Sequence, residues 1–166
     1  LLEGAGVDYL FAPNYAVMYP DDYRYMVTEK DFSKLLCGAK RPGHFDGVLT
    51  VVMKLLNIVR PANAYFGEKD FQQLTLLRGM VEAFFMNINL VGCPIVREKN
   101  GLAISSRNRK LSQQGLALAP KFHEILAAGG TESEIASNLE KAGFKVDYVT
   151  KYNGRLYAAV FLEDVR

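Results

Sequence analysis

The order of short apolar runs and helix-periodic segments in the first hundred residues is the feature that most restricts the fold. From His44 to Arg60, apolar residues recur with the i, i+3, i+4, i+7 spacing of an amphipathic helix, and Pro61 ends this segment. The run "NAYF" at 63–66 is predicted to be a short buried strand. Helical spacing returns from Asp70 to Phe85, and "INLVGCPIV" at 88–96 is predicted to be the next strand. This alternation predicts βαβ crossovers and a parallel sheet.

Two further elements are expected upstream of the long helix. The apolar run from Val7 to Ala12 is predicted to be an earlier strand of the sheet, and a short helix is expected around Asp31 to Leu36. The sequence starts without an initiator methionine, on an apolar tail followed by Gly4 and Gly6, as the end of a helix leading into a strand would. We therefore expect it to be a fragment that lacks an N-terminal part of a larger fold.

Helix-capping signals dominate the region after residue 110. Ser112 is placed to cap a helix that reaches about Ala127. The sequence "TESE" at 131–134 is a capping box that opens a second helix, which Gly143 can end. His123 lies inside the first of these helices and is interpreted as structural.

A β-hairpin is expected at the end of the chain. Two β-rich runs flank the turn pair Asn153 and Gly154, which is the strongest hairpin signal that a short sequence gives. A parallel half followed by an antiparallel half predicts an α/β chain of two domains. We place a parallel-sheet domain at residues 1–95 and a small α+β domain with helices and an antiparallel hairpin at residues 96–166.

Composition argues against several classes of protein. A net charge of +2 and a pI near 8.5 are too mild for nucleic-acid binding, which needs a clustered basic face. Cys37 and Cys93 have neither CxxC nor histidine-paired spacing, so no disulfide framework or zinc site is indicated and a cytoplasmic location fits best. No stretch approaches the roughly 18 uninterrupted apolar residues of a membrane span, so no membrane partner is expected.

The stretch "FGEKDFQQL" at 66–74 crowds charge where a predicted strand passes into a predicted helix. Parallel sheets bind ligands beyond the carboxyl ends of their strands, where helix N-termini present free amides. Gly67 lets a ligand approach the backbone, and Lys69 is a compact cation suited to phosphate oxygens. In the alternative interpretation, Asp70 and Gln73 merely cap the helix, and their spacing does not decide between the two. Lys69 favours the anion site, because a cation at a helix N-terminus opposes the macrodipole.

The stretch "GLAISSRNRK" at 101–110 is a second candidate for phosphate binding. Ser105 and Ser106 stand beside Arg107, and hydroxyls with a guanidinium make a flexible clamp for a triphosphate. On charge alone, a solvated basic loop is the commoner explanation.

The stretch "KRPGHFDGV" at 40–48 is a third candidate, with Arg41 and His44 at the start of the long helix. Three roles are open for His44: contact with a ligand, general acid or base catalysis, or a hydrogen bond to the backbone at the start of the helix. A lone histidine most often has the last of these roles.

Three motifs, "RPGHFDGVLTVVMKLLNIVRP", "FGEKDFQQL" and "GLAISSRN", follow one another in this order. Together they closely resemble the pantothenate synthetases, a family of ATP-dependent ligases of vitamin B5 synthesis. The resemblance covers essentially the whole chain and is strongest from Arg41 to Asn108. It implies a nucleotidyltransferase-superfamily fold, with a Rossmann-like domain that is incomplete here at its N-terminus and a C-terminal domain that closes over the ATP site.

The resemblance also implies an activity. Family members condense pantoate with ATP to a pantoyl adenylate and pyrophosphate, after which β-alanine attacks the adenylate to give pantothenate and AMP. Mg²⁺ accompanies the ATP, no tightly bound cofactor is expected, and a homodimer is implied.

The family's site residues carry over to named positions in this sequence. Those implied to bind ATP are Gly67, Glu68, Lys69, Asp70, Val96, Ile104, Ser105, Ser106 and Arg107. Gln73 is implied to bind pantoate, Arg41 and His44 are possible site residues, and no protein ligand for a metal is assigned. Lys69 and Arg107 are the candidate catalytic residues, because cations placed near the phosphates stabilise charge that develops in adenylation.

The chain departs from the family pattern in several places. Ile104 stands where the family usually has Met, and Asn100 where it often has Asp. The family's HxGH-type ATP motif lies upstream of Leu1, so we expect the 166 residues to be inactive alone. The alternatives are another nucleotidyltransferase, such as a cytidylyltransferase that uses CTP, or a non-catalytic nucleotide-binding module.

Overall fold

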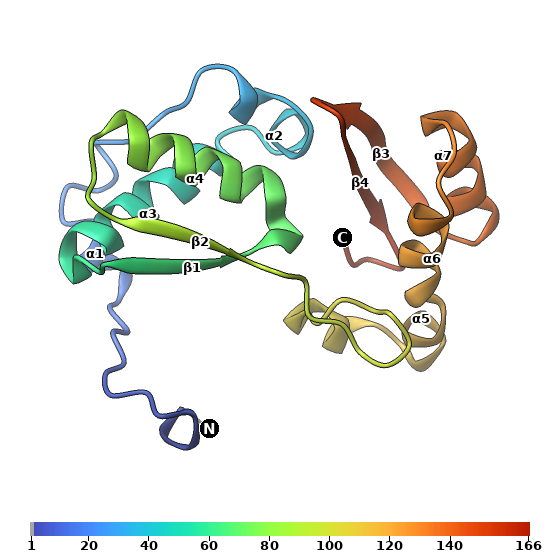
Figure 1. Cartoon of the computed structure of the whole chain (residues 1–166), viewed down its shortest axis with the longest axis horizontal. Helices are drawn as coiled ribbons and strands as arrows, with labels where there is room; N and C mark the ends of the chain where they lie inside the picture. Colours follow the sequence, from blue (N-terminus) through green and yellow to red (C-terminus); the bar gives the residue numbers. More distant parts are fainter. Residues whose placement is uncertain (1) are drawn as a thin grey trace.

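The computed structural model describes residues 2–166, whose elements form two groups that lie side by side (Figure 1). The first group is built from two helices and two strands: α3 (His44–Val59), β1 (Asn63–Gly67), α4 (Phe71–Ala83) and β2 (Asn89–Cys93). The second contains three helices and a hairpin: α5 (Gln113–Leu118), α6 (Pro120–Ala128), α7 (Glu132–Lys141), β3 (Lys145–Tyr152) and β4 (Arg155–Phe161). Shorter helical turns are η1 (Glu3–Ala5), α1 (Tyr15–Met18), η2 (Phe32–Lys34), α2 (Cys37–Lys40), η3 (Glu68–Asp70) and η4 (Ser106–Lys110).

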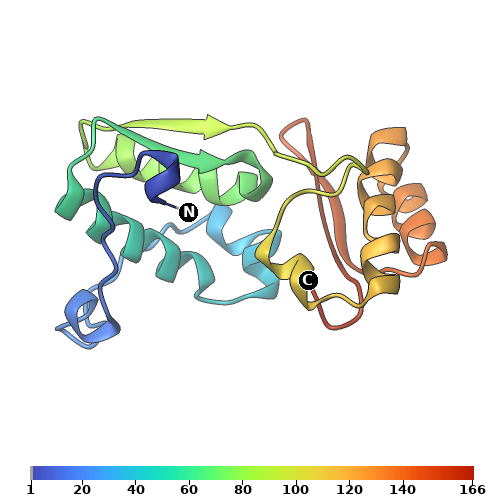
Figure 2. The ribbon, with the colours of Figure 1, turned by 90° about the horizontal axis from the view of Figure 1, so that it is seen from below.

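The predicted parallel pairing is confirmed in the first group. β1 and β2 run parallel, with Gly67 opposite Cys93, and α4 makes the crossover between them. Both α3 and α4 lie on one side of the strands (Figure 2), where Phe66 packs against their buried leucines. Tyr65 points to the other face and is 67% exposed, because successive strand residues alternate between faces.

The strand predicted at residues 7–12 is wrong. The segment has no strand structure, and Tyr9 and Leu10 are 93% and 72% exposed. A strand exists only where a neighbour completes its backbone hydrogen bonds, and no strand within residues 2–166 pairs with this segment. The short helix expected at 31–36 is a single 3-10 turn, η2, within that range, and α2 follows it.

Local capping chemistry explains the helices of the second group. The Ser112 hydroxyl accepts a hydrogen bond from the Gly115 amide at 3.0 Å, and Thr131 and Glu134 form the predicted capping box. The single helix expected from Ser112 is two helices, because Pro120 starts α6 at a position where its missing N–H is tolerated.

The predicted antiparallel hairpin of β3 and β4 is confirmed as well. Asn153 and Gly154 have φ of 48° and 77°, the left-handed pair that a two-residue hairpin turn requires. The second group has its own core, which is centred on Ile135, Leu139 and Phe144.

Side chains of the hairpin and of the C-terminal residue contact the η2 and α2 segment, which packs against the core of the first group. Phe32 stacks on Tyr152 with ring centroids 5.1 Å apart, and Arg166 donates to the Cys37 sulfur at 3.0 Å. None of the helices within residues 2–166 is both long and apolar enough to cross a membrane.

Candidate functional site

A cavity of about 650 Å³ lies between the two groups. Its walls come from the start of α3, the junction of β1 with α4, the loop that contains η4, and the inner side of the hairpin. The predicted site residues that line it are Arg41, His44, Glu68, Lys69, Asp70, Gln73, Ser105, Ser106 and Arg107. Three motifs that are separate in sequence therefore meet at one cavity.

The junction between β1 and α4 places Lys69 just before the N-terminus of α4. Glu68, Lys69 and Asp70 form the 3-10 turn η3, and Asp70 directly precedes α4 without making a side-chain cap hydrogen bond. The interpretation that Asp70 serves only as a helix cap is therefore not supported. Lys69 is exposed and takes part in none of the ion pairs found within residues 2–166.

Two adjacent amides at the start of α4 have different surroundings. Gln72 is buried, and its side chain accepts from the Cys37 amide at 3.1 Å while it donates to the carbonyls of Phe32 and Leu35 at 2.8 and 2.9 Å. Gln73 is half-buried and faces the cavity. The first amide thus fastens the η2 and α2 segment to α4, and the second is available to a ligand.

The loop after β2 is ordered by short hydrogen-bonded turns. The Ile104 amide donates to the Val96 carbonyl at 3.0 Å, and the Ser105 hydroxyl accepts from the Arg107 amide at 3.2 Å, which caps η4. Arg107 projects from η4 as an exposed cation on the cavity wall, and it too is absent from the ion pairs of the described residues.

Three predicted ATP-binding residues are not part of this cavity wall as the structure places it. They are Gly67, Val96 and Ile104. Val96 and Ile104 are 67% and 53% exposed, and open space surrounds the position that a Cβ on Gly67 would occupy. Their role in ATP binding stays a prediction.

His44 sits in a strongly positive environment at the start of α3. Burial lowers the pKa of its imidazole, the guanidiniums of Arg41, Arg166 and Arg107 lower it further, and Asp70 opposes them. Arg41 Nη1 lies 3.0 Å from His44 Nε2. Because a guanidinium only donates, Nε2 is the acceptor and the neutral imidazole carries its proton on Nδ1.

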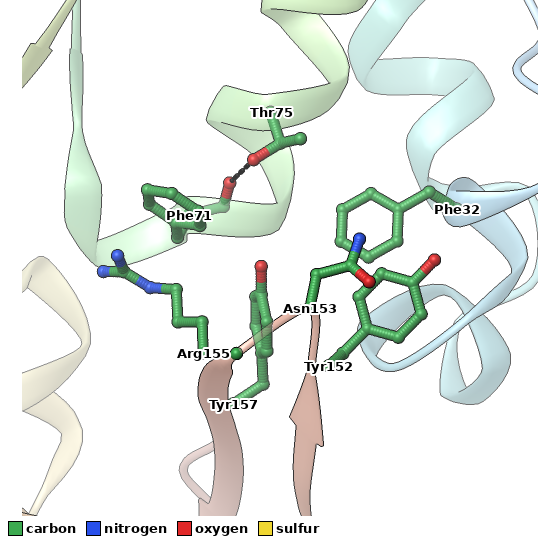
Figure 3. Close-up of a pocket in the computed structure, with 8 residues that line it drawn as sticks. Phe32, Phe71, Thr75, Tyr152, Asn153, Arg155 and Tyr157 are labelled. Atoms are coloured by element: carbon green, nitrogen blue, oxygen red, sulfur yellow. Dashed lines mark hydrogen bonds between the residues drawn. The ribbon is translucent and has the colours of Figure 1, made fainter.

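A second cavity, of about 660 Å³, lies at the tip of the hairpin (Figure 3). Its lining residues are Phe32, Phe71, Thr75, Tyr152, Asn153, Gly154, Arg155 and Tyr157. It contains none of the predicted phosphate-binding residues. Phe71 and Arg155 line both cavities, and the Arg155 guanidinium carbon lies 3.5 Å from the centre of the Phe71 ring.

Sequence reasoning missed the hairpin's contribution to the site. Tyr148 and Arg155 of the hairpin, together with the C-terminal Arg166, line the cavity between the two groups. Strand alternation could not have placed Tyr148, because the register shifts between Val146 and Tyr148. Within residues 2–166, no group of three or more His, Cys, Asp or Glu side chains is placed to hold a metal ion.

The sequence is similar to proteins of one family over its whole length. A family profile described as Pantoate-beta-alanine ligase matches residues 1–160. A pantothenate synthetase of Bdellovibrio bacteriovorus is 54% identical over 166 residues, and one of Legionella pneumophila strain Lens is 48% identical. The match covers 100% of this chain and 66% of each relative, so the chain spans just under two thirds of their length.

Solved structures show the same similarity in three dimensions. The pantoate-beta-alanine ligase of Francisella tularensis, complexed with beta-gamma ATP and beta-alanine, matches with a TM-score of 0.92 at 38% identity, covering 99% of this chain and 64% of that one. The pantothenate synthetase of Thermus thermophilus matches with a TM-score of 0.79 at 41% identity, covering 95% and 62%. These matches confirm the predicted α/β fold class. The chain belongs to the pantoate-beta-alanine ligase family.

Proposed function

We propose that the full-length protein condenses pantoate with β-alanine in an ATP-dependent reaction that forms pantothenate, AMP and pyrophosphate. The observation that carries the proposal is the meeting of Lys69, Gln73 and Arg107 at one cavity. Two cations without ion-pair partners among the described residues and one half-buried amide suit a polyphosphate beside a small polar acid. Family membership and the Francisella relative, solved with ATP and β-alanine, support the same assignment.

The proposed reaction has two steps. A carboxylate oxygen of pantoate attacks the α-phosphorus of ATP, and the bond to the departing pyrophosphate breaks. The amine of β-alanine then attacks the acyl carbon of the adenylate, so that an amide forms, AMP leaves and the amine loses a proton. Negative charge grows on the departing pyrophosphate in the first step. We assign Lys69 and Arg107 to stabilise this charge more in the transition state than in the ground state.

Further assignments belong to the same proposal. We propose that ATP also contacts the segment from Gly67 to Asp70, Val96 and the segment from Ile104 to Ser106, and that Gln73 holds pantoate. The boundary between a nucleotide-binding domain and a closing domain is placed at residues 95 and 96, since the two core clusters lie on either side of it.

The substrate complex and the assembly are proposed as well. ATP is expected to react as its Mg²⁺ complex, because its phosphates are the preferred oxygen ligands of this ion. A homodimer is proposed from the resemblance. A cytoplasmic location is proposed from the two cysteines, which are free thiols in the structure.

Exchange of labelled pyrophosphate into ATP tests the adenylate step. With full-length protein, Mg²⁺ and pantoate, but without β-alanine, label is expected to enter ATP, and omission of pantoate is expected to stop it. An enzyme that makes pantothenate but shows no pantoate-dependent exchange would contradict the adenylate. Replacing ATP with CTP tests the cytidylyltransferase alternative, which predicts that CTP is preferred.

A further inference from the structure

Arg155 brings a cation from the hairpin to the wall of the cavity between the two groups. It opens β4 directly after the Asn153–Gly154 turn, and its side chain is exposed. No ion pair within residues 2–166 includes it. Figure 3 shows its guanidinium beneath Phe71, on the side away from Phe32 and Tyr152.

Stacking on Phe71 fixes this guanidinium without using its hydrogen-bond donors. The guanidinium carbon lies over the ring, 3.5 Å from its centre, which is a cation–π contact. The N–H donors of arginine lie in the plane of the group and point outward from its edge. The contact therefore orients Arg155 and leaves its donor edge available to an acceptor.

The position of Phe71 brings Arg155 to the predicted phosphate site. Phe71 is the first residue of α4 and directly follows Lys69 and Asp70. The cavity between the two groups is lined by Arg155 together with Lys69 and Arg107. Three cations, from the β1–α4 junction, from η4 and from the hairpin, thus line one cavity, and none of them has an ion-pair partner among the described residues.

We propose that Arg155 is a further substrate-binding residue, which the hairpin contributes and Phe71 orients, and that its donor edge binds an oxyanion of a substrate in the cavity between the two groups. The inference rests on the proposed function. The oxyanion is a phosphate of ATP or a carboxylate of one of the two acids, since a guanidinium binds both bidentately. Because β4 carries this residue, the site is complete only when the hairpin lies against α4.

Steady-state kinetics of the full-length protein test the inference with Arg155→Gln. Loss of a charge-assisted hydrogen bond is expected to raise one KM by about 10- to 100-fold. A rise in the KM for ATP, with slower pantoate-dependent pyrophosphate exchange, identifies a phosphate as the ligand. A rise in the KM for β-alanine with normal exchange identifies its carboxylate, and a rise for pantoate identifies the other acid. Arg155→Lys, which keeps the charge but not the planar fork, is expected to recover part of the loss.

Two control variants separate binding from a structural role. Phe32→Leu removes the stacking of Tyr152, from the same hairpin, on η2 but changes no charge. Lys151→Gln removes a cation from the same hairpin that lines neither cavity. Both are expected to keep the parent's KM values. If Phe32→Leu reproduces the effect of Arg155→Gln, or if Arg155→Gln changes no KM, the inference is overturned. Pantoate-dependent exchange by the parent protein would still support the proposed function in either case.

Discussion

The Nη1 atom of Arg41 lies 3.0 Å from the Nε2 atom of His44, at the first turn of α3. This pair makes His44 a neutral acceptor in the folded protein, because burial and three nearby guanidiniums lower the pKa of the imidazole. In the unfolded chain the same group titrates near its ordinary value of about 6.5.

The lowered pKa of His44 predicts a pH dependence of stability. Below a pH of about 6.5 the unfolded chain binds more protons at this residue than the folded protein does, so the free energy of unfolding rises with pH in that window. The contribution is fully present above about pH 6.5 and is lost as the pH falls through the folded pKa. Urea unfolding of the full-length protein between pH 5 and 8 is expected to show a smaller pH slope for His44→Asn than for the parent. Identical slopes would contradict the neutral assignment.

Lys69→Ala and Arg107→Ala are each expected to lower turnover by about 10²- to 10³-fold, by analogy with the loss of one preorganised donor to a transition-state charge. Both side chains lie on the cavity wall outside any ion pair of the described residues, so the melting temperature is expected to stay unchanged. Arg109→Ala is the matched control, because Arg109 lies in η4 but outside the cavity wall. A variant with near-normal turnover would remove its residue from the catalytic assignment.

The same substitution is expected to affect stability at Gln72 and substrate binding at Gln73. Gln72→Leu leaves the Cys37 amide and two carbonyls without their partner and is expected to lower the free energy of unfolding by about 1–3 kcal/mol. Gln73→Leu is expected to raise the KM for pantoate by roughly tenfold with little change in stability. Chemical unfolding and steady-state kinetics on both variants distinguish the two roles. A stability loss for Gln73→Leu comparable with that for Gln72→Leu would contradict the assignment of a structural role to Gln72 and a binding role to Gln73.

Gly67 and Gly38 provide a second matched pair. A Cβ on Gly67 meets nothing within 4 Å, so Gly67→Ala is expected to fold normally and to bind ATP more weakly, if the nucleotide approaches the backbone there. A Cβ on Gly38 would lie 1.8 Å from the Ser33 carbonyl oxygen, so Gly38→Ala is expected to lose about 3 kcal/mol of stability. Thermal unfolding and ATP titration measure both effects. Normal ATP affinity in Gly67→Ala would contradict the close approach.

Local chemistry made the helices and the hairpin predictable from the sequence. The capping box of Thr131 and Glu134, the periodicity of α3 and the Asn153–Gly154 turn each depend on residues only a few positions apart, and all three appear as expected. The family motifs are equally local, because "GEKD" and "SSR" are short continuous segments. The sequence by itself therefore determined the order of the elements from α3 to β2, the hairpin, the family and the three stretches from which the cavity is built.

Only the tertiary structure decided which of these residues meet and what each contact does. The run at 7–12 has the composition of a strand, but it has no pairing partner within residues 2–166. Gln72 and Gln73 are chemically identical, and only the position of the η2 and α2 segment separates the buried amide from the one that faces the cavity. The contact of Arg155 with Phe71 joins residues far apart in sequence. Such contacts depend on how whole elements pack, because a side chain's periodicity and capping signals extend only over its own helix, strand or turn.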